Sequence, residues 1–194
     1  NTKKDSLAAQ TYNKIYEIDP DKKIKYLEKA GHIYFKLGNS SSAYKAYNTL
    51  LQKGYINDRI LINIAAIEFQ SHKYEKTISL LKKIKDTITL NTDIMKMYAV
   101  SYYETKKYSE AQKYFNHFLK KESLEKDFIE KAVRSYENTN NLPSAVIMYR
   151  RYLSLKKDKN HKDFGYRLAE IYEKQKSIPS AIEQYQKNIE LFPD

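Results

Sequence analysis

The 194-residue sequence contains no cysteine and no tryptophan, and it has only four glycines and four prolines. A chain without cysteine forms no disulfide bond and offers no thiolate to a metal ion. Its apolar residues never continue for the roughly 18 to 20 positions that a membrane-spanning helix needs. These absences exclude a disulfide framework, a zinc–thiolate centre and a transmembrane helix from the sequence given.

The sequence also lacks the common motifs of enzymes. Its four histidines, His32, His72, His117 and His161, are far apart, and none belongs to the HExxH pattern that binds zinc. It has no glycine-rich loop for phosphate, no cysteine nucleophile and no serine in a strand-turn-helix elbow. We therefore expect a non-enzymatic protein that binds no metal and no cofactor.

The ends of the sequence and its lack of cysteine bear on its origin. It begins with Asn1 rather than methionine and ends on Pro193-Asp194, so we expect a piece of a longer protein. The lack of cysteine is compatible with both oxidising and reducing compartments. It favours a periplasmic or cell-envelope location slightly over a cytoplasmic one, and the compartment stays open.

The charge of the chain has two interpretations. Lysine and arginine number 35 against 24 acidic residues, which gives a formal net charge of +11. Such a basic chain can bind nucleic acid or an anionic membrane surface. The abundance of Lys, Asn, Ile and Tyr is also typical of an AT-rich genome, which produces the same excess without any function. The positions of the charges must therefore decide between them.

A small residue recurs along the chain at a nearly fixed interval. The intervals are 34, 34, 34 and 36 residues, between Ala43, Thr77, Ala111, Ala145 and Ala181. A large apolar or aromatic residue follows each of them four positions later, at Tyr47, Leu81, Phe115, Tyr149 and Tyr185. A repeat of this length is typical of stacked helical hairpins, in which small residues let two helices approach closely.

Each repeat predicts a first helix (helix A), a turn and a second helix (helix B). Turn residues such as Gly38 separate the two helices, and Pro143 and Pro179 stand in first turns of helix B, where proline is tolerated. We expect about eleven helices in a single solenoid: a lone helix B at 6–20 and repeats at 24–57, 58–91, 92–125, 126–161 and 162–194.

Counted from Ile24, the pattern is a large apolar residue at position 4, a small one at 8, an aromatic one at 11, alanine at 20, an aromatic one at 24 and proline at 32. This pattern resembles the tetratricopeptide repeat, with Glu68, Thr77 and Gly165 as departures. The resemblance implies an all-α, right-handed superhelical solenoid of about five and a half repeats. It also implies a concave groove, lined by helix A, that receives a peptide or helix of a partner protein.

In this family, positions 2, 5, 9, 12 and 13 of helix A point into the groove. Position 12 carries an aromatic row, Phe35, Phe69 and Tyr103, which could anchor apolar side chains of a partner. The alternative is that these rings only pack between neighbouring helices, and it stays open. Further groove candidates in the first two repeats are Lys25, His32, Arg59 and Asn63. One subgroup of the family binds the C-terminal carboxylate of a peptide with a set of lysine, arginine and asparagine residues. Only Asn63 matches that set, so we do not expect this chain to bind a C-terminal carboxylate in that way.

The groove positions of the last two repeats are mostly acidic. The candidates there are Asp127, Glu130, Glu137, Asp163, Tyr166, Glu170 and Glu173. Much of the basic excess instead lies on helix B and its exit, at Lys82, Lys83, Lys85, Lys120, Lys121, Arg150, Arg151, Lys156, Lys157 and Lys159. This separation suggests a partner segment with basic residues near one end. The alternative is that the carboxylates balance nearby lysines.

We therefore expect a scaffold or adaptor that binds another protein, with a bacterial secretion, cell-envelope or motility assembly as the suggested setting. A nucleic-acid binder is the second class, although the acidic helix-A residues make nucleic acid an unlikely partner. Binding of the basic helix-B side to anionic lipid is a third possibility. Self-association through the apolar ends of the array is a fourth.

Overall fold

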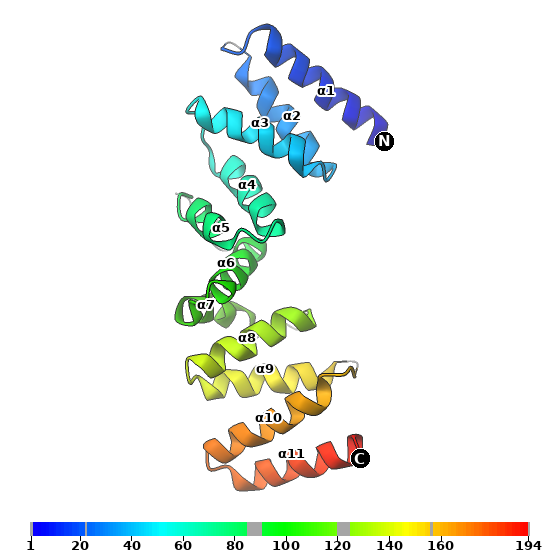
Figure 1. The fold of residues 1–194 in the computed structure, drawn as a ribbon, viewed down its shortest axis with the longest axis vertical. Helices are drawn as coiled ribbons and strands as arrows, with labels where there is room; N and C mark the ends of the chain where they lie inside the picture. The colour runs from blue at the N-terminus through cyan, green and yellow to red at the C-terminus, as the bar shows by residue number, and fades with distance from the viewer. Residues whose placement is uncertain (1, 22, 85–90, 120–124, 156, 194) are drawn as a thin grey trace. The chain divides into compact units, whose positions relative to one another are not determined.

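The structure, a computed structural model, describes residues 2–21, 23–84, 91–119, 125–155 and 157–193. In these ranges it contains eleven α-helices, one 3-10 helix and no strand (Figure 1). The helices are α1 (Thr2–Ile18), α2 (Ile24–Lys36), α3 (Ser40–Gln52), α4 (Asp58–Gln70), α5 (Tyr74–Leu81), α6 (Thr92–Glu104), α7 (Tyr108–Phe115), η2 (Asn116–Phe118), α8 (Lys126–Asn138), α9 (Leu142–Ser154), α10 (His161–Lys174) and α11 (Ile178–Leu191). The expected all-α class with about eleven helices is confirmed.

The chain forms two compact units, residues 1–90 (unit 1) and 91–194 (unit 2). In unit 1, α1 packs on α2, α2 on α3 and α4 on α5, and in unit 2 the pairs are α6 with α7, α8 with α9 and α10 with α11. The predicted helix A of each repeat corresponds to α2, α4, α6, α8 and α10. Helix α1 overlaps the lone helix expected at 6–20, and the division into repeats and the single solenoid over 1–194 stay predictions.

Every turn from helix A to helix B has the same geometry. One residue in each has φ between 55° and 74°, at Gly38, His72, Lys106, Asn140 and Lys176. The next backbone N–H then bonds the carbonyl five residues earlier, as Lys107 does to Tyr102 at 2.8 Å. This arrangement satisfies the last carbonyls of helix A and reverses the chain.

Helix B begins with the residues that the sequence suggested. Pro143 and Pro179 stand in the first turns of α9 and α11. The side chain of Asn39 accepts a hydrogen bond from Ser42 N at 3.1 Å and so caps α3. No helix in the described ranges has the length and apolar character needed to cross a bilayer.

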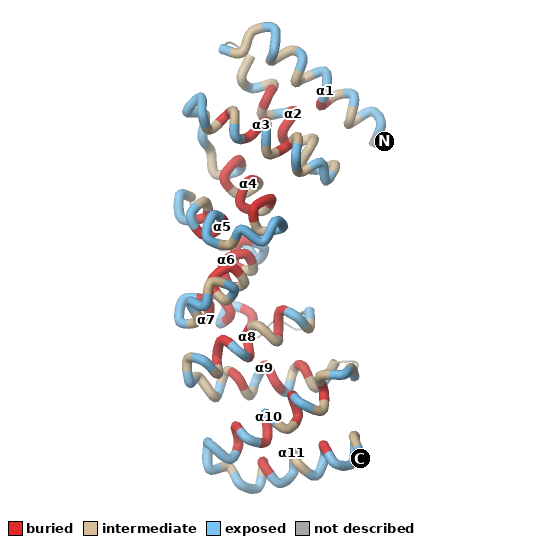
Figure 2. The backbone as a smooth tube through the Cα atoms, in the orientation of Figure 1, coloured by how far each residue is buried: buried red, intermediate tan, exposed pale blue. Residues whose placement is uncertain are grey.

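The periodic small residues are buried on helix B. Ala43, Thr77, Ala111 and Ala145 are fully buried. Figure 2 shows the buried segments along the helices in red. Gly31 shows how close the approach is, because a Cβ added there would lie 2.8 Å from Cε1 of Tyr47. The missing side chain of Gly31 therefore makes room for the Tyr47 ring.

Two departures from the repeat pattern have local explanations. Glu68, which replaces an aromatic residue, is only 2% exposed and accepts a hydrogen bond from Tyr44 Oη at 3.0 Å, with Lys73 Nζ at 3.3 Å. Gly165 replaces a large residue because the amide of Asn188 fills the space, and a Cβ at Gly165 would overlap it. Each substitution is thus matched by a polar side chain from a neighbouring helix.

Candidate functional site

The helix-A side of unit 1 contains a half-buried polar chain that links three helices. Asn63 of α4 donates a hydrogen bond from Nδ2 to Tyr47 Oη of α3 at 2.8 Å. The Tyr47 hydroxyl lies 2.8 Å from Nδ1 of His32 on α2. Because the Tyr47 hydroxyl accepts a hydrogen bond from Asn63, it donates its own proton to Nδ1 of His32. The ring proton of His32 is therefore assigned to Nε2, which lies 3.5 Å from Glu28 Oε1.

Glu28 extends this polar chain to the loop between α3 and α4. Its two carboxylate oxygens accept hydrogen bonds from Tyr55 Oη at 2.8 Å and Asn57 Nδ2 at 2.9 Å. The same Asn57 side chain caps α4 by accepting from Ile60 N at 2.9 Å. The polar chain therefore fixes the start of α4 relative to α2.

The environment of this polar chain shifts several pKa values. Burial alone would raise the pKa of Glu28, but the hydrogen bonds from Asn57 and Tyr55 and the adjacent His32 outweigh it, so this pKa lies below its usual value. Burial, and then the charge of Arg59, lower the pKa of His32. Burial raises the pKa of Tyr47 to about 12. Near pH 7 the polar chain thus holds an anionic Glu28 and a neutral His32.

The predicted groove residues of unit 1 differ in their exposure. Lys25 and Arg59 are exposed, whereas His32 and Asn63 belong to the polar chain just described. Phe35 is half-buried and packs against the core around Ile60 and Ile64 of α4.

Phe69 is also half-buried, and its ring lies 5.9 Å from that of Tyr74 in an edge-to-face contact. On the same face of α4, Ile62 and Ala66 are half-buried. Ile62, Ala66 and Phe69 therefore form a continuous apolar strip on α4.

Tyr103, the third member of the aromatic row, lies in unit 2. Its ring is half-buried, 5.7 Å from that of Tyr108, and Lys131 Nζ lies 5.4 Å from its centre. Burial raises the pKa of Tyr103. All three rings of the row thus have packing contacts within their own units, and their binding of a partner stays a prediction.

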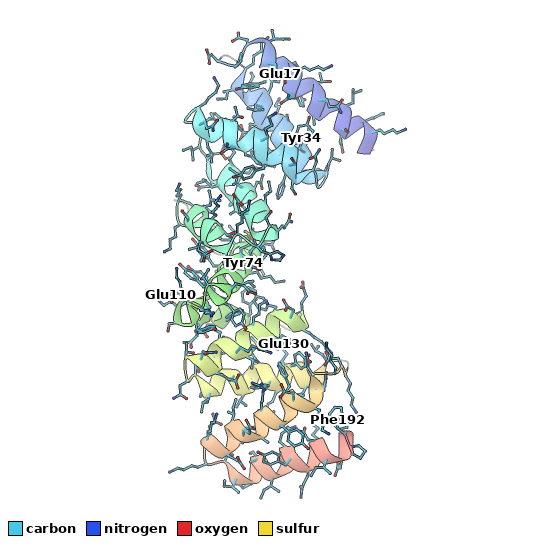
Figure 3. All side chains as sticks on the ribbon, viewed as in Figure 1. Glu17, Tyr34, Tyr74, Glu110, Glu130 and Phe192 are labelled. Atoms are coloured by element: carbon cyan, nitrogen blue, oxygen red, sulfur yellow. The ribbon has the colours of Figure 1, made fainter. Side chains whose placement is uncertain are left out.

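Glu130, labelled in Figure 3, lies on α8 of unit 2 and is tied to the loop before α10. Its Oε1 accepts hydrogen bonds from Asn160 Nδ2 at 2.8 Å and Tyr152 Oη at 3.1 Å. The buried Tyr152 hydroxyl also lies 2.9 Å from Asp158 Oδ2, which Lys126 Nζ approaches to 2.7 Å. Glu130 therefore occupies the place in unit 2 that Glu28 has in unit 1, since both bind the loop that leads to the next helix A.

Basic side chains at position 6 of helix A neutralise other acidic candidates. Lys131 lies 2.8 Å from Glu104 and 3.3 Å from Asp127. Lys131 is not among the site residues predicted from the sequence, although its position four residues after Asp127 is a signal for this ion pair.

Arg167 has the same role one repeat later. It lies 2.9 Å from Asp163 and 4.0 Å from Glu137, which also accepts a hydrogen bond from Tyr149 Oη at 2.9 Å. Glu170 and Glu173 are exposed and form no ion pair with a described residue. Glu170 and Glu173 are therefore exposed carboxylates of α10 that take no part in the ion pairs of Lys131 and Arg167.

The basic residues of helix B are partly engaged in holding the fold. Arg151 donates two hydrogen bonds of 2.8 Å to the carbonyls of Phe118 and Leu119, and Arg150 donates one of 2.7 Å to Tyr172 Oη. Four of the other basic residues noted in the sequence lie outside the described residues: Lys85, Lys120, Lys121 and Lys156. Within the residues described, no group of three or more His, Asp or Glu side chains could hold a metal ion.

Comparison with known proteins supports the repeat assignment. Sequence profiles of the tetratricopeptide repeat match residues 24–52, 97–123 and 163–194. A search of curated proteins finds no match.

Among solved structures, MamA AMB-1 superposes with a TM-score of 0.66 at 15% identity, covering 88% of this chain and 92% of that one. YrrB, described as a TPR protein with an unusual peptide-binding site, superposes with a TM-score of 0.65 at 15% identity, covering 96% and 95%. The matched profiles therefore identify tetratricopeptide repeats at residues 24–52, 97–123 and 163–194, and the superpositions show that the chain has the fold of solved TPR structures.

Proposed function

We propose that this chain is a non-enzymatic scaffold that binds a segment of another protein on the helix-A face of its repeats. Support at the level of the fold comes from the family and from YrrB, whose description names a peptide-binding site. Within the chain, the observation that carries the proposal is the half-buried strip Ile62, Ala66 and Phe69 on α4, next to the hydrogen-bonded chain that includes Asn63.

This arrangement favours binding because its polar groups are already fixed. Asn63, Tyr47 and His32 hold one another, so they lose little conformational freedom when a partner arrives. The apolar strip beside them offers surface whose burial would favour association. A short amphipathic segment with two or three apolar side chains fits this surface, in the manner of a helix or strand laid on a groove.

In unit 2 the ion pairs of the carboxylates limit where basic residues of a partner are expected to bind. Lys131 and Arg167 neutralise Asp127 and Asp163, so we propose that basic partner residues meet Glu170 and Glu173 instead. The nucleic-acid alternative gains nothing from Arg151, since its guanidinium group already binds two backbone carbonyls. A bacterial secretion, envelope or motility assembly stays the suggested setting, on composition and on the resemblance to the repeat family.

Site-specific photo-crosslinking in cells of the source organism tests the proposal. A photoreactive residue replaces Ala66 on the apolar strip, and a matched one replaces Ser79, which is exposed on helix α5 of the same unit. We expect a defined protein adduct from position 66 and none from position 79. Equal adducts from both positions, or none from position 66, would contradict binding at the helix-A face.

A substitution that blocks the strip then measures its importance with the identified partner. Ala66→Arg places a long charged side chain on the strip without removing a buried group, and Ser79→Arg is its control. We expect a loss of affinity of about tenfold or more for Ala66→Arg in calorimetric titration. Unchanged affinity would place the binding surface elsewhere on the chain.

A further inference from the structure

Arg59 is an exposed cation on the helix-A face of unit 1, and it forms no ion pair with a described residue. It is the second residue of α4, and the spacing of Arg59, Ile62, Ala66 and Phe69 places all four on one side of the helix. After burial, its charge is the next cause of the lowered pKa of His32 on α2, so the guanidinium group lies near the polar chain. The apolar strip on α4 therefore has an exposed guanidinium group at its N-terminal end.

The acidic residues of α2 and α4 do not neutralise Arg59. The carboxylate of Glu28 already accepts two hydrogen bonds, at 2.8 and 2.9 Å. Glu68 is buried and lies 3.3 Å from Lys73 Nζ. Asp58 directly precedes Arg59, and consecutive residues of a helix do not face each other. These three are the only acidic residues of the two helices, so neither helix supplies a carboxylate to Arg59.

Other basic residues of unit 1 add positive charge to the same face. Lys25 and Lys36 are exposed near the two ends of α2, and their spacing from His32 places them on its side of the helix. A partner for this surface needs apolar side chains accompanied by carboxylates. Nucleic acid fits less well, because bases stack on flat aromatic faces and the middle of the strip, at Ile62 and Ala66, is aliphatic.

The length of the strip limits the length of the segment that covers it. From Arg59 to Phe69, α4 rises by about 15 Å, at about 1.5 Å per residue. A helical segment of about ten residues, or an extended one of about five, spans that distance. A short internal segment of a partner is therefore sufficient.

We propose that the partner segment bound on α4 is both acidic and apolar: an aspartate or glutamate of the partner pairs with Arg59, and apolar side chains of the same segment contact Ile62 and Ala66. This inference rests on the proposed function, because it names the chemistry of the partner for the same surface. A guanidinium group binds a carboxylate with two parallel hydrogen bonds, so the pair also fixes the direction of the segment along α4.

Selection from a random peptide library, with the 194-residue chain as bait, tests the inference. The library displays about 12 random residues between glycine-serine flanks, which is enough to cover the strip and leaves no free terminal carboxylate. Peptides that the strip-blocked variant Ala66→Arg also retains are discarded. Arg59→Glu reverses the charge at the strip, and Lys45→Glu is its matched control, because Lys45 is exposed on α3 of the same unit. Circular dichroism and the urea midpoint check that each variant is folded.

The wild type and Lys45→Glu should enrich apolar peptides that contain aspartate or glutamate. Arg59→Glu should enrich apolar peptides with lysine or arginine instead, because the attraction is reversed. In fluorescence polarisation, a peptide selected on the wild type should bind Arg59→Glu at least about tenfold more weakly than Lys45→Glu. Alanine at the acidic position of the peptide should remove most of that difference, since the two substitutions act on one pair.

The possible failures separate this inference from the proposed function. Peptides that require the unblocked strip but show no preference for acidic residues, or the same preference with Arg59→Glu, would overturn the acidic partner and leave the binding surface in place. A library that yields no peptide sensitive to Ala66→Arg would overturn both. Displacement of the selected peptide by a mixed-sequence RNA oligonucleotide from the wild type, but not from Arg59→Glu, would make nucleic acid the occupant and overturn the inference.

Discussion

Replacement of Gly31 by alanine tests the close packing of α2 on α3. Alanine favours a helix over glycine by about 1 kcal/mol, so on local grounds Gly31→Ala should stabilise the chain. The structure predicts the opposite. A Cβ at this position would lie 2.8 Å from Cε1 and 3.1 Å from Cδ1 of Tyr47, and 3.4 Å from Cβ of Ala46.

The Tyr47 ring has little freedom to move away. It is fully buried, and its hydroxyl is held by Asn63 and His32 at 2.8 Å each. Overpacking a core typically costs about 1 to 3 kcal/mol. After the gain in helix propensity of about 1 kcal/mol is subtracted, we expect Gly31→Ala to lower the free energy of unfolding by up to about 2 kcal/mol.

Urea denaturation followed by circular dichroism measures the change, with the m-value checked because the chain has two units. The double variant Gly31→Ala/Tyr47→Leu supplies the control, since it removes the ring that the new methyl group meets. We expect the two substitutions to be less damaging together than their sum, by about 0.5 to 3 kcal/mol. A higher midpoint for Gly31→Ala, or strict additivity in the double variant, would refute the close contact.

Three further predictions concern other parts of the chain. Gly165→Ala should destabilise unit 2, because the new Cβ would overlap the amide of Asn188. The double variant Gly165→Ala/Asn188→Ala should recover stability in the same urea assay. Equal losses of stability in the single and the double variant would contradict the overlap. Lys106→Gly should stabilise the chain by about 0.5 to 1 kcal/mol, because Lys106 has a φ of 59° that glycine adopts without strain. Asn140→Gly should raise the stability by less, since asparagine tolerates this conformation better than lysine. A lower stability of Lys106→Gly would argue against backbone strain at this turn. The fold lowers the pKa of His32, so the contribution of His32 to stability is complete above its ordinary pKa of 6.5 and is lost as the pH falls below that value. Between pH 7.5 and 5.5 the urea midpoint should therefore fall less for His32→Gln than for the wild type. An equal fall in both proteins would exclude His32 as the cause.

Much of the candidate site is beyond prediction from one sequence because it depends on partners from neighbouring helices. The sequence shows Glu130 and Asp127 as carboxylates of one acidic face. The structure ties Glu130 to Tyr152 and Asn160 and pairs Asp127 with Lys131. A pairing four residues apart is readable from the sequence, whereas contacts across 22 and 30 residues depend on how the helices stack.

The sequence by itself determined the length of the repeat, the alternation of helices A and B, and the turns between them. These features follow from local chemistry, since a small residue every 34 residues and a turn residue such as Gly38 act within one hairpin. Only the tertiary structure decided that Gly165 faces Asn188 and that Phe35 packs on the core around Ile64. Those outcomes depend on which side chains of separate helices compete for the same space, and helical periodicity along one segment carries no information about that competition.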